Sequence, residues 1–284
     1  MTSRSLDALF GLRLFFKAEN LQRAGSFKIR GASNVLWSME DSEAQKGVLT
    51  HSSGNFAQGL ALAARERGIP AYIVIPENAP SVKIEATRSY GATIRLCAAS
   101  VAAREQAAEE WQKETGACFV HPYDDPLIIA GQGTAAMEFL EEIPDLDFLI
   151  APVGGGGLCA GTVLAGLAFG SPSLTVLGAE PSGADDAWRS LDQGILLPQE
   201  NPQTIADGLR TSLGRHPFDV FTRFGTQILR VEEQTIKEAM GLLEERMKLV
   251  VEASGAVPLA ALRSSHSIPP GAKVGIILSG GNKA

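Results

Sequence analysis

The feature of this 284-residue chain that most constrains its fold is the alternation of short apolar segments with longer alanine-rich ones. The short segments are rich in β-branched residues and are bounded by glycine, proline or polar residues, as β-strands are. They cover residues 47–51, 71–75, 93–96, 148–153, 175–178 and 274–278. Strands that alternate with helices need crossover connections, which produce parallel sheets with helices on both faces. We therefore predict an α/β protein.

Two helical patterns are the clearest between these strands. Residues 59–67 are alanine-rich and end before Gly68. In 235–250, apolar residues recur at spacings of 4, 3, 4 and 3, which predicts a helix with one apolar face. These residues are Ile236, Met240, Leu243, Met247 and Val250.

Composition and charge restrict the class of protein. Hydrophobic residues make up 45% and charged residues 20% of the chain, which is typical of a soluble protein with one large or two medium domains. The net charge of −7 offers no basic surface to nucleic acid or an anionic membrane, and no segment has the pattern of a signal peptide or membrane span. Cys97, Cys118 and Cys159 lie far apart and form no CxxC pair, so neither a disulfide framework nor a zinc site is indicated. We expect a cytoplasmic protein.

A glycine run follows the predicted strand 148–153 and leads into a small-residue helix over 159–168. The run consists of Gly154, Gly155, Gly156 and Gly157, followed by Leu158. Glycines without a Cβ let backbone N–H groups converge on a phosphate, and the helix dipole adds a favourable potential. Ligands of open parallel sheets bind beyond the carboxyl ends of the strands, which is where this run lies. It predicts a phosphate site, with a simple strand-to-helix turn as the alternative.

Two further strand ends carry hydroxyl groups and glycine. The segment HSSGNFAQG (51–59) follows one strand and opens a helix, which its serine and asparagine side chains could also merely cap. Ser279, followed by two glycines, ends the strand 274–278. Together with Lys28, which lies between Phe27 and Ile29, these segments fit one pocket for a phosphorylated aromatic cofactor held against an amine. An exposed surface lysine is the alternative for Lys28.

Seven segments resemble one family in order along the chain, from about Leu12 to Asn282. They are GSFKIRGA, SSGNFAQG, AGQGT, GGGGL, TIADGL, ERMKLVVE and SGGN. They resemble those of the fold-type II pyridoxal phosphate enzymes, in the family of serine racemase and the threonine and serine dehydratases. The resemblance implies a tryptophan synthase β-like α/β fold with two parallel or mixed sheets and the cofactor between two domains. The implied large domain comprises 1–46 plus 125–284, and the small inserted domain comprises 47–124.

The resemblance assigns cofactor roles to the matching residues. Lys28 would form the Schiff base, Phe27 would lie against the pyridine ring, and Asn55 would bind the 3-hydroxyl group. Ser279 would face the ring nitrogen, which a serine, unlike a carboxylate, need not keep protonated. The phosphate would accept hydrogen bonds from the backbone of Gly154, Gly155, Gly156, Gly157 and Leu158.

The implied reaction is that of a dehydratase, or ammonia-lyase, which converts L-threonine, L-serine or a related β-hydroxy amino acid to a 2-oxo acid and ammonia. Lys28 would remove the Cα proton, and the cofactor phosphate is our candidate proton donor to the leaving hydroxyl. Arg104 aligns with a position that reaches the substrate in serine racemase-like members, with a solvated helix arginine as the alternative. The substrate carboxylate would bind to the loop of Ser52, Ser53, Gly54, Asn55 and Phe56.

Racemisation is the alternative activity. In racemase-like members a serine at the position of Ser53 lies on the cofactor face opposite the lysine, so Lys28 and Ser53 would form a two-base pair. A β-replacement synthase is a second alternative, although such enzymes lack the segment EPSGADD (180–186) found here. A binding module without catalysis is a third.

The segment EPSGADD also predicts a cation site. In similar enzymes the residues that match Glu180, the carbonyl of Ala184 and Asp186 bind Mg²⁺ or Ca²⁺, and oxygen ligands suit these hard cations. Acids in the first turn of a helix are the alternative. His51, His121, His216 and His266 show no ligand spacing and are interpreted as structural or surface residues.

Two departures from the family pattern affect these expectations. Phe56 replaces a histidine that many relatives carry, which favours a bulkier or less polar substrate side chain, such as that of a β-aryl serine. The chain also starts later than typical relatives and stops just after Asn282, so we expect no appended regulatory domain. The relatives suggest a homodimer.

Overall fold

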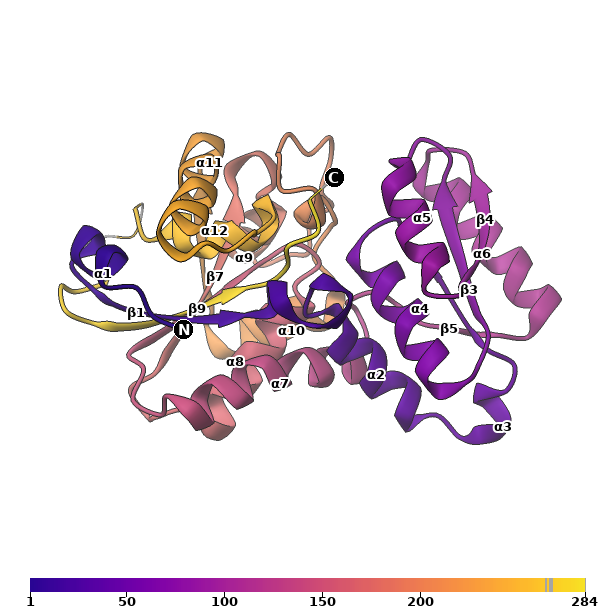
Figure 1. Cartoon of the computed structure of the whole chain (residues 1–284), viewed down its shortest axis with the longest axis horizontal. Helices are drawn as coiled ribbons and strands as arrows, with labels where there is room; N and C mark the ends of the chain where they lie inside the picture. Colours follow the sequence, from indigo (N-terminus) through magenta and orange to yellow (C-terminus); the bar gives the residue numbers. More distant parts are fainter. Residues whose placement is uncertain (264, 266–267, 284) are drawn as a thin grey trace. The chain divides into compact units, whose positions relative to one another are not determined.

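The computed structural model describes residues 1–263, 265 and 268–283. These residues divide into two compact units. Unit 1 comprises Met1–Phe27 and Gln132–Lys283, and unit 2 comprises Lys28–Gly131. Each unit contains its own parallel sheet with helices around it (Figure 1).

Unit 1 is built on a five-stranded sheet in the order β1-β9-β6-β7-β8. The strands are β1 (Arg13–Ala18), β6 (Phe148–Pro152), β7 (Thr175–Pro181), β8 (Gln227–Val231) and β9 (Lys273–Leu278). Every neighbouring pair is parallel. Because all five strands run the same way, the segments after β6, β7 and β9 leave the sheet at one edge. This edge carries the glycine run, the 180–186 segment and Ser279.

Helices cover both faces of this sheet. Figure 1 shows α8 below it and α12 above it, and the packing of apolar side chains such as Leu14, Phe16, Ile150 and Ile276 forms the main core. The helical elements of unit 1 are α1 (Arg4–Phe10), η1 (Glu19–Leu21), η2 (Arg23–Gly25), α8 (Gly157–Phe169), η3 (Ser182–Ala184), α9 (Asp186–Gln193), η4 (Asp207–Leu209), α10 (Arg215–Phe224), α11 (Glu233–Leu242), the π-helix η5 (Leu243–Met247) and α12 (Ala253–Ala261). Helix α7 (Pro126–Glu142) contains the division at Gly131.

Unit 2 has a four-stranded parallel sheet in the order β4-β3-β2-β5. Its strands are β2 (Val48–His51), β3 (Ala71–Pro76), β4 (Thr93–Cys97) and β5 (Cys118–Phe119). Its helices are α2 (Lys28–Ser38), α3 (Asp41–Ala44), α4 (Asn55–Arg67), α5 (Ser81–Ser89) and α6 (Val101–Thr115). A core cluster around Leu49, Val74 and Trp111 joins α6 to the sheet.

The predicted α/β class and all six predicted strands are confirmed, within one to three residues at their ends. Strands β1, β5 and β8 were not predicted from the sequence. β5 has only two residues, whereas β1 and β8 carry charged side chains among their apolar ones. The domain boundaries expected from the family stay a prediction.

The predicted single helix over 235–250 is wrong at its carboxyl end. Helix α11 passes into a π-helical turn, and Lys248 then adopts a left-handed conformation with φ of +60°, which ends the helix. Leu249 is consequently buried and Val250, which the periodicity places on the apolar face, is 54% exposed. A π-helical turn shifts the helical phase, so a 3.6-residue period cannot be extended through it.

The helices within 1–263 and 268–283 include none that is both long and apolar enough to cross a membrane. His266 lies outside the described residues.

Candidate cofactor and substrate site

The glycine run of unit 1 connects the carboxyl end of β6 to the amino end of α8. All residues from Gly154 to Leu158 are buried. The hydrogen bonds of the described residues include none donated by the N–H groups of Gly154, Gly155 or Gly156, and the first N–H groups of any α-helix lack partners within the helix. Buried donors without acceptors are costly unless a ligand satisfies them. The run therefore suits a phosphate group, as the sequence predicts.

A second segment, residues 208–217, packs against this run and explains two of its glycines. A Cβ on Gly154 would lie 2.8 Å from the Cα of Leu209, and one on Gly156 would lie 2.6 Å from the Cβ of Pro217. Gly156 also has a φ of +88°, which L-residues with a side chain rarely adopt. The N–H of Gly214 donates to the carbonyl of Gly155 at 3.1 Å. These two glycines are thus required for the close packing of the run against 208–217 as well as for its buried N–H donors.

Ser279 and Phe27 lie together at the same edge of the unit 1 sheet. Ser279 follows β9, which is the direct neighbour of β6, and it is only 3% exposed. Its carbonyl accepts a hydrogen bond from the N–H of Phe27 at 3.0 Å. Asn282 anchors the same region, because its Nδ2 donates to the carbonyl of Ala24 at 2.8 Å. The structure thus brings together, in unit 1, the residues predicted for the pyridine ring wall and the ring nitrogen.

Lys28 is the first residue of α2 in unit 2, and its amine is held in place. Nζ donates to the carbonyl of Pro122 at 3.1 Å and lies 5.6 Å from the centre of the Phe56 ring. Helix α4 approaches closely at this point, since a Cβ on Gly59 would lie 3.1 Å from the carbonyl carbon of Lys28. The side chain is half-buried. It is therefore not the freely exposed surface lysine of the alternative interpretation.

The predicted substrate loop connects β2 to α4 in the same unit. Its residues Ser52, Ser53, Gly54 and Asn55 are half-buried, whereas Phe56 is 2% exposed. The N–H of Ser52 donates to the carbonyl of Val74 at 3.1 Å, which attaches the loop to β3. The residue before α4 is Gly54, which has no side chain to cap the helix. The amino end of α4 therefore has N–H groups that suit an anion such as a substrate carboxylate.

Arg104 lies at the same edge of the unit 2 sheet. Its positive charge lowers the pKa of His51, the last residue of β2, although burial of the imidazole is the larger cause. The charge of Arg104 thus acts at the end of β2, next to Ser52, which is compatible with a role in binding an anion.

A turn after β5 was not recognised from the sequence. In this turn the Nδ1 of His121 accepts hydrogen bonds from the N–H groups of Tyr123 and Asp124, at 3.3 and 2.8 Å. Burial lowers the pKa of His121, which keeps Nδ1 able to accept. The turn holds Pro122, the residue whose carbonyl binds Lys28. The only signal for it in the sequence is the segment HPYDDP, because its strand is too short to predict.

The predicted cation residues lie together after β7. Glu180 and Asp186 are each 1% exposed, and Ala184 is equally buried. Burial raises the pKa of Glu180 well above its usual value, and the charge of Asp186 raises it further. Burial likewise raises the pKa of Asp186, to about 6. Two buried carboxyls that interact electrostatically favour a bound cation, because the cation would offset the cost of burying their charges.

These carboxylates also accept hydrogen bonds from the backbone. Glu180 accepts from the N–H of Trp188 and Asp186 from that of Leu213, both at 2.7 Å. Each carboxylate has about four lone-pair positions, so these bonds leave room for a cation. The described residues contain no cluster of three or more His, Cys, Asp or Glu arranged as metal ligands. A cation here would depend on two carboxylates, backbone carbonyls such as that of Ala184, and water.

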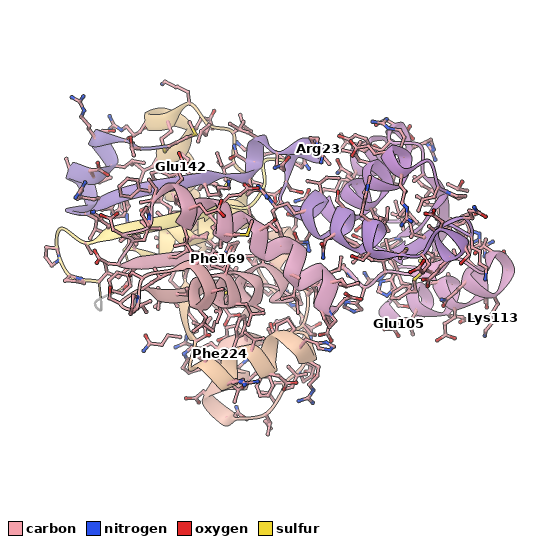
Figure 2. All side chains as sticks on the ribbon, turned by 90° about the horizontal axis from the view of Figure 1, so that it is seen from below. Arg23, Glu105, Lys113, Glu142, Phe169 and Phe224 are labelled. Atoms are coloured by element: carbon pink, nitrogen blue, oxygen red, sulfur yellow. The ribbon has the colours of Figure 1, made fainter. Side chains whose placement is uncertain are left out.

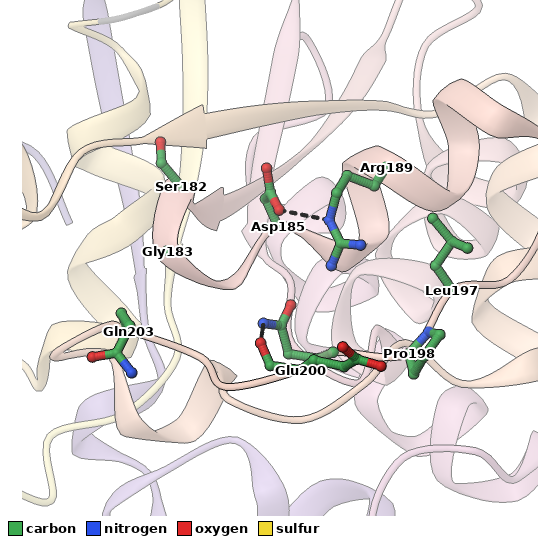
Figure 3. Close-up of a pocket in the computed structure, with 9 residues that line it drawn as sticks. Ser182, Gly183, Asp185, Arg189, Leu197, Pro198, Glu200 and Gln203 are labelled. Carbon is green, nitrogen blue, oxygen red and sulfur yellow. Dashed lines mark hydrogen bonds and ion pairs between the residues drawn. The ribbon is translucent and has the colours of Figure 1, made fainter.

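An open pocket of about 510 Å³ lies over the 182–185 turn (Figure 3). One wall is formed by Ser182, Gly183, Asp185 and Arg189, and the other by residues 197–200 with Gln203. Figure 3 shows Asp185 and Arg189 pointing toward each other, with Nε of Arg189 at 2.8 Å from the carboxylate. The pocket gives solvent access to the turn that contains Ala184.

Comparison with known proteins decides the family. The family model described as "Pyridoxal-phosphate dependent enzyme" matches residues 1–280. The chain belongs to this family. A serine racemase of Oryza sativa subsp. indica is 47% identical over 287 residues, covering 99% of this chain and 84% of the relative. A β-hydroxyaspartate dehydratase of Paracoccus denitrificans is 43% identical over 281 residues, covering 99% and 89%.

Solved structures of serine racemases have the same fold as this chain. Maize serine racemase superposes with a TM-score of 0.97 at 45% identity, covering 100% of this chain and 88% of that one. The serine racemase of Dictyostelium discoideum superposes with a TM-score of 0.95 at 44% identity, covering 100% and 92%. The predictions of a fold-type II pyridoxal phosphate enzyme of the serine racemase family, and of a lyase or racemase as its class, are confirmed.

The predicted cofactor and substrate residues fall into two groups. Unit 1 brings together the phosphate run, Phe27 and Ser279, and unit 2 brings together Lys28, Ser53, Asn55 and Arg104. The sequence patterns predict both groups, but they do not predict the turn at His121 and Pro122 or the segment 208–217 behind the glycine run.

Proposed function

We propose that this enzyme is an ammonia-lyase that converts a β-hydroxy amino acid to a 2-oxo acid and ammonia, with racemisation as a second activity. The observation that carries this proposal is the position of Lys28. Its amine is held by the carbonyl of Pro122 and lies over the ring of Phe56, in the first turn of α4, in a chain of the pyridoxal phosphate family. An amine held at one point can act as a base on one face of a bound amino acid.

The residues present fit pyridoxal phosphate. The run from Gly154 to Leu158 offers buried N–H donors for its phosphate, and Phe27 and Ser279, which are joined by a backbone hydrogen bond after β9, would contact its ring. In unit 2, Lys28 would attach to the cofactor and Asn55 would bind its 3-hydroxyl. When bound, pyridoxal phosphate withdraws electrons from the Cα of the attached amino acid and so acidifies the Cα proton.

Proton transfer falls to two side chains. Lys28 removes the Cα proton in both proposed activities, because its amine is held at one point by the carbonyl of Pro122 and an amine is a suitable base for this proton. Elimination of the β-hydroxyl then leads to the 2-oxo acid. For racemisation a second group must return a proton to the opposite face, and the hydroxyl of Ser53 is our candidate. Ser53 is a half-buried residue in the loop before α4, the helix whose Phe56 ring lies under the Lys28 amine.

The substrate carboxylate would bind at the amino end of α4, through the loop of Ser52, Ser53, Gly54 and Asn55. Arg104, with its charge close to His51, would reach an anionic group of the substrate. The buried Phe56 replaces a polar ring under the Lys28 amine with an apolar one. We propose that this replacement favours substrates with a larger or less polar side chain, of which a β-aryl serine is the example to test.

The test measures oxo-acid release from L-serine, L-threonine, D-serine, 3-hydroxyaspartate and phenylserine by the purified protein supplied with pyridoxal phosphate. Ammonia-lyase activity predicts stoichiometric ammonia and oxo acid from at least one of them. Formation of cysteine from an activated serine and sulfide, without oxo acid, would instead indicate a β-replacement synthase. A protein that remains colourless with the cofactor, and is not labelled at Lys28 after borohydride reduction, would refute the proposal.

Ser53→Ala tests racemisation separately. Loss of D-serine formation from L-serine, with oxo-acid release retained, is the expected result. Unchanged D-serine formation would exclude Ser53 as the second base.

A divalent cation, Mg²⁺ or Ca²⁺, is the second proposed ligand, held by Glu180, Asp186 and the carbonyl of Ala184. The support is chemical: two nearly inaccessible carboxyls with raised pKa values and a carbonyl-rich turn are oxygen ligands for a hard cation. Calorimetric titration of Mg²⁺ into the wild-type protein and into Glu180→Gln checks this, since the variant should bind at least about tenfold more weakly.

We also propose a homodimer in the cytoplasm. Leu164, Leu167 and Phe169 on α8 are 40%, 60% and 50% exposed, and Figure 2 labels Phe169 and Phe224 among the side chains of unit 1. Exposed apolar residues in one helix favour a protein interface. The three cysteines are free thiols, which agrees with a reducing compartment. Light scattering of the wild type and of Leu167→Asp tests the dimer: the variant should shift toward the monomer.

A further inference from the structure

The proposed cation residue Asp186 contacts the segment that packs behind the phosphate run. Its Oδ2 accepts a hydrogen bond from the N–H of Leu213 at 2.7 Å, and both residues are buried. Hydrogen bonds to a buried carboxylate are among the stronger ones in proteins. The position of the Leu213 backbone therefore depends on Asp186.

The next amide along the chain holds the phosphate run. The N–H of Gly214 donates to the carbonyl of Gly155 at 3.1 Å, so Leu213 and Gly214 use consecutive N–H groups to bind Asp186 and the run. The Leu213 side chain adds a second contact, because a Cβ on Gly156 would lie only 2.7 Å from its Cδ1. Movement of Leu213 would thus be transmitted to the run through both a hydrogen bond and direct packing.

The bond to Gly155 also sets the direction of a phosphate donor. The carbonyl of Gly155 and the N–H of Gly156 belong to one peptide group, which is planar and trans, so they point in opposite directions. Because the carbonyl points at Gly214, the N–H of Gly156 points away from the 208–217 segment. That N–H is one of the buried donors for which the described residues supply no acceptor.

We propose that Asp186 is a positioning residue for the phosphate run, and that cation binding at Asp186 increases the affinity of this run for a phosphate group through Leu213 and Gly214. The proposal rests on the cation site and cofactor of the proposed function. A divalent cation would fix the Asp186 carboxylate, which fixes Leu213, Gly214 and the peptide between Gly155 and Gly156. The cation would thereby act on cofactor affinity without touching the cofactor.

A comparison of two ligands tests this proposal. The holoenzyme is stripped of cofactor, and the dissociation constants of pyridoxal phosphate and of pyridoxal are measured from the change in visible absorbance. Pyridoxal has the same aldehyde and ring but no phosphate. In Asp186→Ala, pyridoxal phosphate should bind about tenfold more weakly, and pyridoxal should bind as in the wild type, since one hydrogen bond that orients the phosphate donors is lost. In Asp186→Asn the loss should be smaller, because the amide oxygen can still accept from Leu213.

Asp185 provides the matched control. It is the neighbouring carboxylate, pairs with Arg189 and Arg230, and makes no hydrogen bond to the 208–217 segment among the described residues. Asp185→Ala should therefore leave the ratio of the two dissociation constants unchanged. Adding Mg²⁺ should tighten pyridoxal phosphate binding in the wild type and in Asp185→Ala, and should have no effect in Asp186→Ala.

Three results would overturn the proposal: an unchanged affinity of Asp186→Ala for pyridoxal phosphate, an equal loss for pyridoxal, or a wild-type affinity that does not respond to Mg²⁺. An equal loss would indicate general damage to the fold, which circular dichroism and the more conservative Asp186→Asn would reveal. Failure of the proposed activity alone has a different signature, namely wild-type protein that binds the cofactor but releases no oxo acid. Such protein would still allow the two-ligand comparison, whereas protein that stays colourless with the cofactor would refute both proposals.

Discussion

The two units present their functional residues in opposite ways. In unit 1 the residues from Gly154 to Leu158 are fully buried and offer backbone N–H groups. In unit 2 the residues from Ser52 to Asn55, and Lys28, are half-buried and offer side chains. Backbone donors are fixed by the fold, whereas side-chain groups depend on neighbours such as Pro122. We infer that unit 1 determines how tightly the cofactor phosphate is held, and that unit 2 determines what is done to the substrate. Substitutions in the two units should separate these quantities.

Lys28→Ala should have the largest effect. Loss of the amine that transfers the Cα proton should reduce oxo-acid release by at least about a thousandfold, while the affinity for inorganic phosphate, a property of unit 1, should change little. Steady-state release of oxo acid and the dissociation constant of inorganic phosphate check the two parts. Lys46→Ala, an exposed lysine of the same unit, is the control and should keep wild-type turnover. If Lys28→Ala retained a tenth of the activity, the assignment of the base would be wrong.

Gly156→Ala, in unit 1, should have the opposite pattern of effects: cofactor affinity should fall and turnover should be kept. The new Cβ would meet Pro217 at 2.6 Å and the residue would be forced to keep a φ of +88°. We expect pyridoxal phosphate affinity to fall by about tenfold or more, with turnover at saturating cofactor close to that of the wild type.

Gly194 offers a matched control for this glycine. It ends α9 with a φ of +69°, yet a Cβ there would meet no atom within 4 Å. Gly194→Ala carries the same backbone strain, of about 1 kcal/mol, without the collision. Equal loss of cofactor affinity in both variants would show that strain, rather than the shape of the phosphate run, is responsible.

Arg104→Gln should have a smaller effect, confined to substrate binding. Loss of a charge near the substrate loop should raise KM by about tenfold and leave kcat within about twofold, if the arginine contacts the substrate equally in the ground and transition states. Arg88→Gln, an exposed arginine paired with Glu85 on α5, serves as the control. An unchanged KM for every substrate tested would restore the alternative of a solvated helix arginine.

The sequence predicts the unit 1 residues more completely than those of unit 2. Glycine runs, Ser279 and the 180–186 segment all lie directly after predictable strands, so the parallel topology places them at one edge. The contacts of Lys28 could not be predicted in this way, because Pro122 follows a strand of only two residues. Nor could the bond from Leu213 to Asp186, which joins residues 27 positions apart through an irregular loop. Local patterns identify the reacting groups, but the groups that position them depend on tertiary packing.

The smallest predicted effect is on the pH dependence of stability, and its direction follows from the pKa shifts at the cation site. The pKa of Asp186 is raised to about 6 and that of Glu180 is raised as well, against unfolded values of about 3.9 and 4.3. A raised pKa means that the folded protein binds these protons more tightly than the unfolded chain does. Without a cation, the two carboxyls therefore contribute most stability at acidic pH, and this contribution is lost as the pH rises through about 6.

A divalent cation reverses this trend because it binds the ionised carboxylates. At a tenfold excess over its dissociation constant, Mg²⁺ should add about 1.4 kcal/mol to the free energy of unfolding at pH 8, which corresponds to about 3 °C in Tm. At pH 5 the same concentration should add almost nothing, since protons occupy the site. Calorimetric melting at both pH values with Mg²⁺ or a chelator measures the difference, and Asp186→Asn should abolish it. A shift of equal size at pH 5 and pH 8 would mean that the cation binds elsewhere, and cofactor affinity would then belong to the glycine run and its packing alone.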